Sequence, residues 1–342
     1  MVQSLTDVMV ECVKCGREVK TDFDSIEQRK MLKCVSCGTS FHINDVYDMY
    51  YDEEPLVKNA IDLITRYANQ PWTVANGKVG NSEKVTAFLK KIGFDSLLGR
   101  ILNDIVKYGD SFLEIIRDPS KNIIELRPFE AKLISFKLGK EIQYGRAFTG
   151  EREVEEFTVS NGKSERRLKP TEVVHSKNTT AYLLYAPYGE AVMRISLNSI
   201  HSLRITRDNA IRLGQKWWVD HLENEICVGI GVPRILLERN YAKNYPKPVL
   251  DIVSTVLLGS VREAQEPIEE SFQSQLFGQL LGEKDLREIP RLEFKKPNSA
   301  TIMKNGGYDF AVEIASLKEA LRLNIITREE YERILNEYLR KS

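Results

Sequence analysis

Residues 188–226 read YGEAVMRISLNSIHSLRITRDNAIRLGQKWWVDHLENEI, and this stretch predicts the principal element of the fold. Its apolar residues recur at steps of three or four, the spacing of one helix face. They are Val192, Ile195, Ile200, Leu203, Ile211, Trp217, Trp218, Leu222 and Ile226. A continuous helix over residues 189–226 would be a rod of about 55 Å at the usual rise per residue.

A break and a second long helix follow. Residues 229–233 combine two glycines with a proline and cannot continue a helix, while residues 234–239 are short and apolar enough for a strand. The second helix carries an apolar face made by Leu250, Val253, Leu257, Val261, Ala264, Ile268, Phe272, Leu276 and Leu280. We expect Pro267 to kink or interrupt it. Helices of this length usually pack against other helices, often from neighbouring subunits; the alternative is an internal hairpin of a monomeric α/β domain.

Length and charge limit the number of domains and the ways in which the chain could contact DNA. The chain has 342 residues, enough for two or three domains, and its 49 basic residues balance its 49 acidic ones. Any contact with DNA must therefore come from local patches or from repetition in an oligomer. The N-terminus has no signal peptide, and the densest apolar run, residues 249–261, is too short to span a bilayer. We expect a protein of the cytoplasm or of a particle, without membrane contact.

Four of the five cysteines form two CxxCG turns, Cys12 with Cys15 and Cys34 with Cys37. Eighteen residues separate the turns, a spacing that suits a zinc ribbon with four thiolate ligands. We expect one structural zinc ion per chain, because a module this small does not fold without metal. The alternative is a redox pair. His42 is either a spare ligand or an ordinary surface histidine.

Between the cysteines and the long helices, the pattern changes from helical to strand-like. Three helices are predicted, one starting at 52–55, one over 82–91 and one over 95–108. Short strands follow at 112–116, 123–126, 133–136, 142–144, 157–159 and 173–175, and they predict a small antiparallel sheet. Towards the C-terminus we expect a strand over 290–297, a helix over 309–323, and a last helix opened by a capping box at 327–330.

Several phrases occur in an order that resembles the portal proteins of tailed bacteriophages. They are KYGDSFLEII (107–116), IELRPF (124–129), PTEVVH (170–175), PYGE (187–190), IGVPRILL (230–237), QLF (275–277), PRLEF (290–294) and LRLNIITREE (321–330). The resemblance runs from about residue 52 to the C-terminus. The cysteine turns depart from it, because an N-terminal ribbon is not a standard portal feature, and the chain is short for the family.

The resemblance implies an α+β, portal-like fold in four parts. These are a zinc ribbon (1–50), a wing of helices and antiparallel sheet (51–188), long stem helices (189–281) with a minimal clip at 229–247, and a C-terminal strand and helical crown (282–342). It also implies a non-enzymatic function: a homo-oligomeric ring, typically of twelve subunits, at one capsid vertex. Such a ring is a conduit for DNA packaging and ejection. Its implied partners are double-stranded DNA, the major capsid protein, the terminase motor and a head–tail adaptor. The implied location is the virion, and the host cytoplasm during assembly.

Candidate residues follow for two further sites. Basic residues that a ring could repeat around a DNA channel are Arg194, Arg212, Lys216, Lys295 and Lys296. Their ordinary interpretation is a solvated helix face of mixed charge. Large apolar residues clustered on the first long helix, Trp217, Trp218 and Leu222, are candidates for a subunit interface, since aromatic anchors dominate interface energetics.

Two rival functions remain open from the sequence. A zinc-ribbon nucleic-acid-binding regulator or recombination factor would explain the cysteines. A metal-dependent nuclease would need acids such as Asp104, Asp110 and Glu114 to converge near a strand. The chain contains no GxxxxGK[ST], GxSxG, HExxH or GxGxxG motif. His175, His201 and His221 have no evident nucleophile beside them and are expected to be structural.

Overall fold

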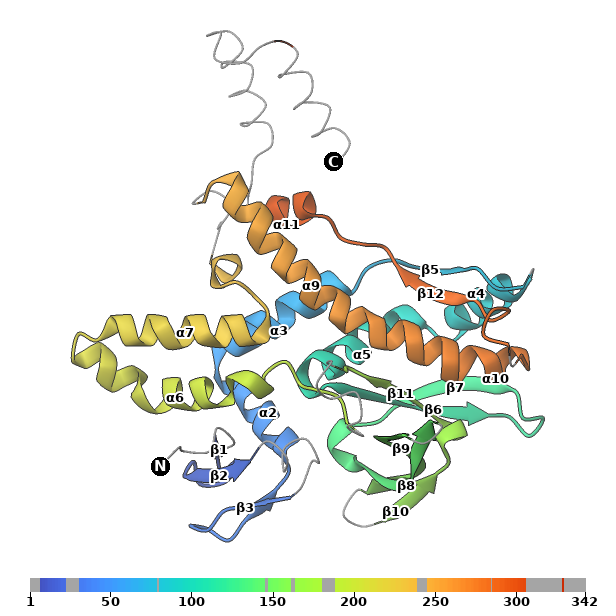
Figure 1. Ribbon diagram of the computed structural model, residues 1–342, viewed down its shortest axis with the longest axis horizontal. Helices are drawn as coiled ribbons and strands as arrows, with labels where there is room; N and C mark the ends of the chain where they lie inside the picture. Colours follow the sequence, from blue (N-terminus) through green and yellow to red (C-terminus); the bar gives the residue numbers. More distant parts are fainter. Residues whose placement is uncertain are drawn as a thin grey trace.

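The computed structural model describes residues 7–22, 31–78, 80–144, 147–160, 164–179, 188–238, 245–283 and 285–305, together with Arg328. Figure 1 shows a central body, an N-terminal ribbon below it, and a pair of helices that project to one side. One long helix runs obliquely across the body. In the described part of the chain, no helix is long and apolar enough to cross a membrane.

The ribbon consists of two small antiparallel hairpins followed by a helix. Its elements are β1 (Asp7–Glu11), β2 (Glu18–Asp22), β3 (Leu32–Lys33), β4 (Ser40–Phe41) and α2 (Ile43–Glu53). Strand β1 pairs with β2, and β3 pairs with β4. Each hairpin carries one CxxC turn. His42 caps α2: its Nδ1 accepts a hydrogen bond from the Asn44 N–H at 3.2 Å, and Asp45 accepts one from the His42 N–H at 2.9 Å.

The ribbon shares its core with the body, although the resemblance implies a boundary between residues 50 and 51. Those residues lie inside α2, and Tyr50 is fully buried. Val8 and Val10 of β1 belong to the same continuous cluster of buried residues as Tyr47 and Ile61. Burial of β1 against helices of the body makes the described part of the ribbon continuous with the main core.

Three helices and a short strand build the first layer of the body. They are α3 (Pro55–Ala68), β5 (Trp72–Ala75), α4 (Asn81–Lys91) and α5 (Phe94–Tyr108). Pro55 occupies the first turn of α3, where its missing N–H costs nothing, and Glu54 caps it. Helix α5 begins at Phe94 after Gly93, one residue before the predicted start. It ends at Gly109, whose φ of 82° is the left-handed conformation that glycine adopts most readily.

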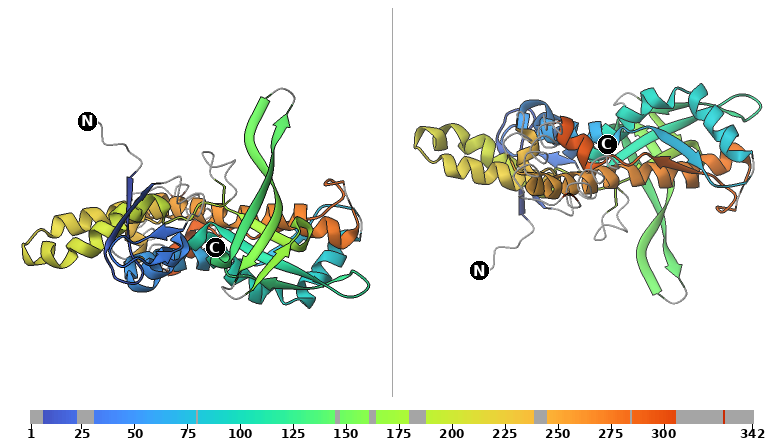
Figure 2. Two further views of the ribbon diagram at one scale, coloured as in Figure 1. Left: turned by 90° about the horizontal axis from the view of Figure 1, so that it is seen from below. Right: turned by 90° about the horizontal axis from the view of Figure 1, so that it is seen from above.

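The predicted single sheet is two three-stranded antiparallel sheets. One has the order β11-β6-β7 and the other β10-β9-β8. The strands are β6 (Asp110–Arg117), β7 (Ile123–Pro128), β8 (Ile134–Tyr144), β9 (Ala147–Ser160), β10 (Glu165–Leu168) and β11 (Val173–Lys177), with short 3-10 turns η1 (Ala131–Leu133) and η2 (Pro170–Glu172). Figure 2 shows β8 and β9 leaving the body as a long two-stranded arm.

The first long helix is broken, so the expected 55 Å rod is wrong. After η3 (Arg194–Ser196), the chain forms α6 (Leu197–Arg212), turns, and returns as α7 (Lys216–Ile230). Gly214 adopts a φ of 71° in the turn, which ends α6 and reverses the chain. The two helices lie side by side as an antiparallel hairpin (Figure 1).

The segment after α7 is also different from the prediction. Helix α7 continues through Gly229 and ends at Ile230, four residues beyond the predicted end, and Arg234–Leu237 forms the 3-10 helix η4 rather than a strand. Leu236 is buried, and Arg234 pairs with Asp220 and Glu223 of α7. The described part of the expected clip therefore lies against the body. Residues 239–244 lie outside the described part of the chain.

The second long helix agrees closely with its predicted apolar face. It is α9 (Lys247–Ser271), continued by the π-helix η5 (Phe272–Phe277) and α10 (Gly278–Leu281). Eight of the nine predicted apolar residues are buried, and Leu280 packs partly buried against the same core. Pro267 lies inside α9 without ending it. The regular α-helical hydrogen bonding changes five residues later, where the π-helix η5 begins.

The C-terminal part returns to the first layer. Strand β12 (Arg291–Phe294) falls within the predicted strand and pairs antiparallel with β5, and the short helix α11 (Ser299–Asn305) follows. The helices predicted over 309–323 and after residue 327 lie outside the described residues, apart from Arg328.

Candidate functional site

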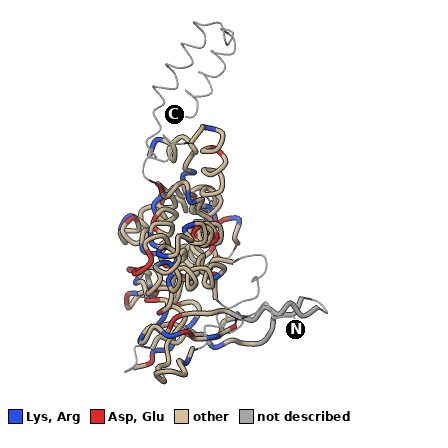
Figure 3. Tube along the Cα trace, turned by 90° about the vertical axis from the view of Figure 1, so that its left-hand side faces the viewer, with Lys and Arg blue, Asp and Glu red and all other residues tan. Residues whose placement is uncertain are grey.

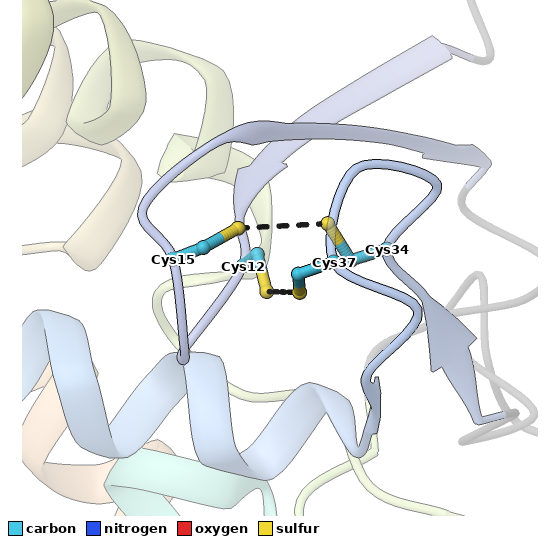
Figure 4. Close-up of side chains that lie close together, drawn as sticks. All are labelled: Cys12, Cys15, Cys34 and Cys37. Carbon is cyan, nitrogen blue, oxygen red and sulfur yellow. Dashed lines mark hydrogen bonds between the residues drawn. The ribbon is translucent and has the colours of Figure 1, made fainter.

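The two cysteine turns face each other across a small gap (Figure 4). All four Sγ atoms lie within 4.8 Å of one another, and the closest pairs are Cys12 with Cys37 at 3.6 Å and Cys15 with Cys34 at 3.7 Å. Four thiolates held about 2.3 Å from a tetrahedral zinc ion would be separated by about 3.8 Å. The prediction that these four residues come together in one cluster able to hold a metal ion is confirmed.

Each turn has the same backbone design. The Cys12 N–H donates to Arg17 O at 2.9 Å and the Gly16 N–H donates to Cys12 O at 2.8 Å. The Cys34 and Gly38 N–H groups repeat these bonds at the same two distances. Gly16 and Gly38 have φ values of 68° and 72°, so a residue with a side chain would strain either turn.

The donor set fits a divalent cation. Hydrogen bonds from the hydroxyl and backbone of Thr39 lower the pKa of Cys37 to about 6, so one thiolate is favoured before any metal binds. His42 is occupied as the cap of α2 and is not a fifth ligand. Among the described residues, the four cysteines are the only group of three or more His, Cys, Asp or Glu side chains that could hold a metal ion.

The acids proposed for a nuclease do not converge. Asp110 is fully buried and contacts His175, with 2.6 Å between Oδ1 and Nε2. Glu114 pairs with Arg166 at 2.5 Å. Asp104 lies on α5 and takes part in neither of these two pairs. No arrangement of these three carboxylates in the structure supports a metal-dependent nuclease.

Asp104 makes a pH-dependent contribution to stability. Burial raises its pKa from 3.8 to about 7, against the opposing effect of Arg100 and Lys107. Because the folded state binds this proton more tightly than the unfolded chain, ionisation of Asp104 destabilises the protein. The cost is absent below about pH 4, grows up to about pH 7, and is complete above that.

Replacing Asp104 with asparagine should therefore stabilise the protein at high pH only. We expect the free energy of unfolding to rise by about 1–3 kcal/mol at pH 8, and the gain to vanish near pH 4. Urea denaturation of the variant and the wild type at both pH values measures this. A variant no more stable than the wild type at pH 8 would contradict the assignment.

Three of the phrases that carried the portal resemblance meet at one junction. Asp110 Oδ1 accepts hydrogen bonds from the Gly189 N–H at 2.8 Å and contacts His175 of β11. The Asn178 N–H donates to Gly109 O at 2.8 Å, and the Glu190 N–H donates to Asn178 O at 2.9 Å. The junction joins the end of α5, strand β11 and the start of the helical hairpin.

The junction is packed as well as hydrogen-bonded. The His175 ring stacks on Phe112 with 4.4 Å between ring centroids, and Tyr188 stacks on Phe136 at 4.2 Å. Gln275 of η5 holds the backbone of His175 through two hydrogen bonds of 2.8 and 3.1 Å. His175 is thus structural, as expected, and it connects the sheet to the long second helix.

The structure does not bring the five candidate channel residues together within one chain. Arg194 pairs with Glu190 at 2.5 Å near the base of the hairpin. Arg212 and Lys216 are exposed at its far end, whereas Lys295 and Lys296 are exposed after β12, on the other side of the body (Figure 1). Basic and acidic residues are interspersed along the described chain (Figure 3).

The three candidate interface residues have different environments. Leu222 is 3% exposed and packs in the core of its own chain. Trp218 is half-buried against that core, with its ring 5.7 Å from that of Trp217. Trp217 itself is 67% exposed. Of the three, Trp217 has the exposure that a contact with another subunit requires.

Comparison with known proteins relates the chain to others through its fold. No protein-family model and no curated protein sequence matches it. A chain in the neck of an empty gene transfer agent (GTA) particle, computed with C6 symmetry, is 12% identical with a TM-score of 0.53, over 83% of this chain and 90% of that one. A chain in the neck of the native particle, computed with C12 symmetry, is 11% identical, also with a TM-score of 0.53 and the same coverage.

The chain shares the fold of these neck chains. An HK97-family phage portal protein from Corynebacterium diphtheriae is also similar, at 10% identity and a TM-score of 0.46, over 75% of this chain and 96% of that one. The portal-like fold with an added cysteine ribbon is what the ordered phrases and the CxxC turns predicted. Sequence reasoning missed the buried contact between Asp110 and His175, although both residues stand inside phrases that it singled out.

Proposed function

We propose that this chain is the subunit of a portal ring at one vertex of a viral head or a similar particle. The observation that carries the proposal is the fold shared with the neck chain of the GTA particle, over most of the length of both chains. The ring, typically of twelve copies, would be a structural conduit for DNA packaging and ejection. Its partners would be the major capsid protein, the terminase motor and a head–tail adaptor.

The shape of the chain suggests which of its elements form the stem, the clip and the wing of such a ring. The α6–α7 hairpin is the helical element that projects from the body, so we place the stem there. Its distal turn, residues 213–215, then takes the place of the minimal clip that we had expected at 229–247. The two sheets with α3–α5 form the wing, and the crown stays a prediction for residues 282–342.

An apolar surface on the hairpin supports assembly. Four large apolar side chains of the hairpin, Ile205, Leu213, Trp217 and Val228, are between 51% and 79% exposed. At the base, Val228 joins residues of η3 and α9 around a groove of about 320 Å³. Large apolar side chains left in water at this density are typical of surfaces that other subunits cover.

Replacing Trp217 with aspartate should lower the fraction of rings. A carboxylate in the centre of an apolar interface is desolvated without a partner, and this commonly costs over 2 kcal/mol at each contact. Images of negatively stained wild-type protein should show rings with an axial hole, and the variant should show mainly small particles. Leu286→Asp is the matched control, because Leu286 is 58% exposed away from the hairpin. Equal ring fractions in Trp217→Asp and wild type would exclude this surface.

Binding to DNA should be weak and independent of sequence. Net charge is zero, and the candidate channel residues Arg212, Lys216, Lys295 and Lys296 act on phosphates only when a ring repeats them. We therefore expect duplex binding that vanishes near physiological salt in a mobility-shift assay. Tight binding to one sequence that persists at physiological salt would instead favour the zinc-ribbon regulator.

We further propose that the metal at the four cysteines is zinc, one ion per chain. Thiolate-only tetrahedral sites of this spacing are structural zinc sites. Cys12, Cys15, Cys34 and Cys37 would hold it and so fix the two turns against each other.

A further inference from the structure

The ribbon is docked on the helical hairpin as well as on the body. Strand β1 lies along α6, and the Met9 N–H donates to Asn198 Oδ1 of α6 at 2.8 Å. Val8 and Val10 of the same strand are fully buried. The first cysteine turn therefore begins at the end of a strand that is packed against the base of the hairpin.

The contact at the end of that strand is an ion pair next to a metal ligand. Glu11 directly precedes Cys12 and is only 7% exposed. Arg204 of α6 donates to both of its carboxylate oxygens, at 2.8 and 3.3 Å, and His201 of α6 lies 3.6 Å away. Two parallel bonds from a guanidinium fix the carboxylate in orientation as well as in position.

Arg204 extends this connection to α2. Its Nη2 also donates to Glu53 Oε2 at 2.6 Å, and its guanidinium lies 5.6 Å from the centroid of the Tyr50 ring. The Tyr50 hydroxyl in turn accepts a hydrogen bond from the Glu11 N–H at 3.3 Å. One arginine of the hairpin thus joins the ligand strand, helix α2 and α6 in a single half-buried network.

Arg207, one turn further along α6, makes a separate attachment. It donates to Glu54 at 2.8 Å, at the start of α3, and lies 3.8 Å from Glu223 of α7. Beyond Arg207, residues 211–217 are all exposed. The base of the hairpin is therefore joined to the ribbon through Asn198, His201 and Arg204, and to the start of α3 through Arg207.

We propose that the ribbon is a metal-dependent brace for the hairpin. Metal at the four cysteines fixes the strand end that carries Glu11, and Glu11 fixes Arg204. Loss of the metal frees that strand end and removes the support that Arg204 gives the hairpin, while Arg207 and the buried faces of α6 and α7 remain on the body. This inference rests on the proposed metal site. If the hairpin contacts neighbouring subunits, the brace makes ring assembly depend on the supply of zinc.

Hydrogen exchange over residues 197–230, in full-length protein before and after treatment with a zinc chelator, tests the proposal. In the wild type we expect removal of the metal to speed exchange in α6 and α7 by about tenfold or more, as for release of a locally closed unit. Arg204→Met should exchange fast while still holding one zinc per chain, and should respond little to chelation. Arg204→Lys keeps the positive charge but cannot make two parallel hydrogen bonds to the Glu11 carboxylate. It takes the place of Arg204→Met in this experiment if the methionine variant does not fold.

Arg207→Met is the matched control on the same helix. It should also speed exchange in the hairpin, but its exchange should still respond to chelation as in the wild type. Two results would overturn the brace: unchanged hairpin exchange after the metal is removed, or an Arg204 variant that responds like the wild type. Metal analysis of the untreated protein distinguishes failure of the metal site from failure of the brace. Absence of zinc would overturn both, whereas zinc without an effect on the hairpin would overturn only the brace.

Discussion

Alanine in place of Gly189 is expected to destabilise the chain strongly. A Cβ at this position would lie 1.9 Å from the Gly109 carbonyl oxygen and 2.9 Å from the Asn178 nitrogen. Both are backbone atoms of the junction, so no side-chain rotation relieves the contact. We expect the free energy of unfolding to fall by at least about 3 kcal/mol, the upper end of the range for overpacked cores. The variant could also fail to fold.

Gly99→Ala is the control for this prediction. Gly99 lies within α5, and a Cβ there would have the Asn69 side chain at 3.7 Å as its nearest neighbour, an ordinary contact. Alanine should leave the protein as stable as the wild type or stabilise it by up to about 1 kcal/mol, because alanine is the better helix former. Thermal and urea unfolding of both variants measures the difference. Equal stability of Gly189→Ala and wild type would show that the junction is looser than described.

Replacing Cys34 with serine should remove the metal and unfold more than the ribbon. A structural zinc site contributes about 10–16 kcal/mol of apparent binding free energy to a small module, and serine does not replace a buried thiolate ligand. Because Val8, Val10 and Tyr50 share one core, loss of the ribbon should extend to α2. We expect the zinc content to fall from one per chain to about zero, with fast hydrogen exchange over residues 7–22 and 31–53.

Cys227→Ala is the matched control, since Cys227 is a 1% exposed cysteine at the end of α7, outside the cluster. It should keep one zinc ion per chain and normal exchange in the ribbon. Stoichiometric zinc with native exchange in Cys34→Ser would contradict the four-thiolate site. Unfolding confined to residues before Ile43 would contradict the shared core.

Local patterns predicted those elements whose signal lies in neighbouring residues. The three-to-four spacing from Leu250 to Leu280 marked the buried face of α9 because one helix packs its whole length on the body. The two CxxCG turns predicted the cysteine cluster because ligand type and spacing are both local. The end of α5 at Gly109 followed from glycine in the same way.

The errors arose where distant contacts decide the structure. Apolar spacing continues through Gly214, so it could not distinguish one rod from two antiparallel helices, and burial against α2, α3 and the ribbon favours the hairpin. Residues 234–237 are apolar enough for a strand but pair with no strand in the described part of the chain, and they form a 3-10 turn held by Arg234. The junction of Asp110, His175 and Gly189 joins residues up to 79 positions apart, which periodicity does not detect.

The mass of the purified wild-type chain in solution tests the central claim most directly. Light scattering at several concentrations should give a particle of several hundred kilodaltons, and twelve copies of the 39.2 kDa chain would weigh about 470 kDa. The particle should keep this mass on dilution if the subunits form a closed ring. A mass of 39.2 kDa that persists at high concentration would contradict the portal ring.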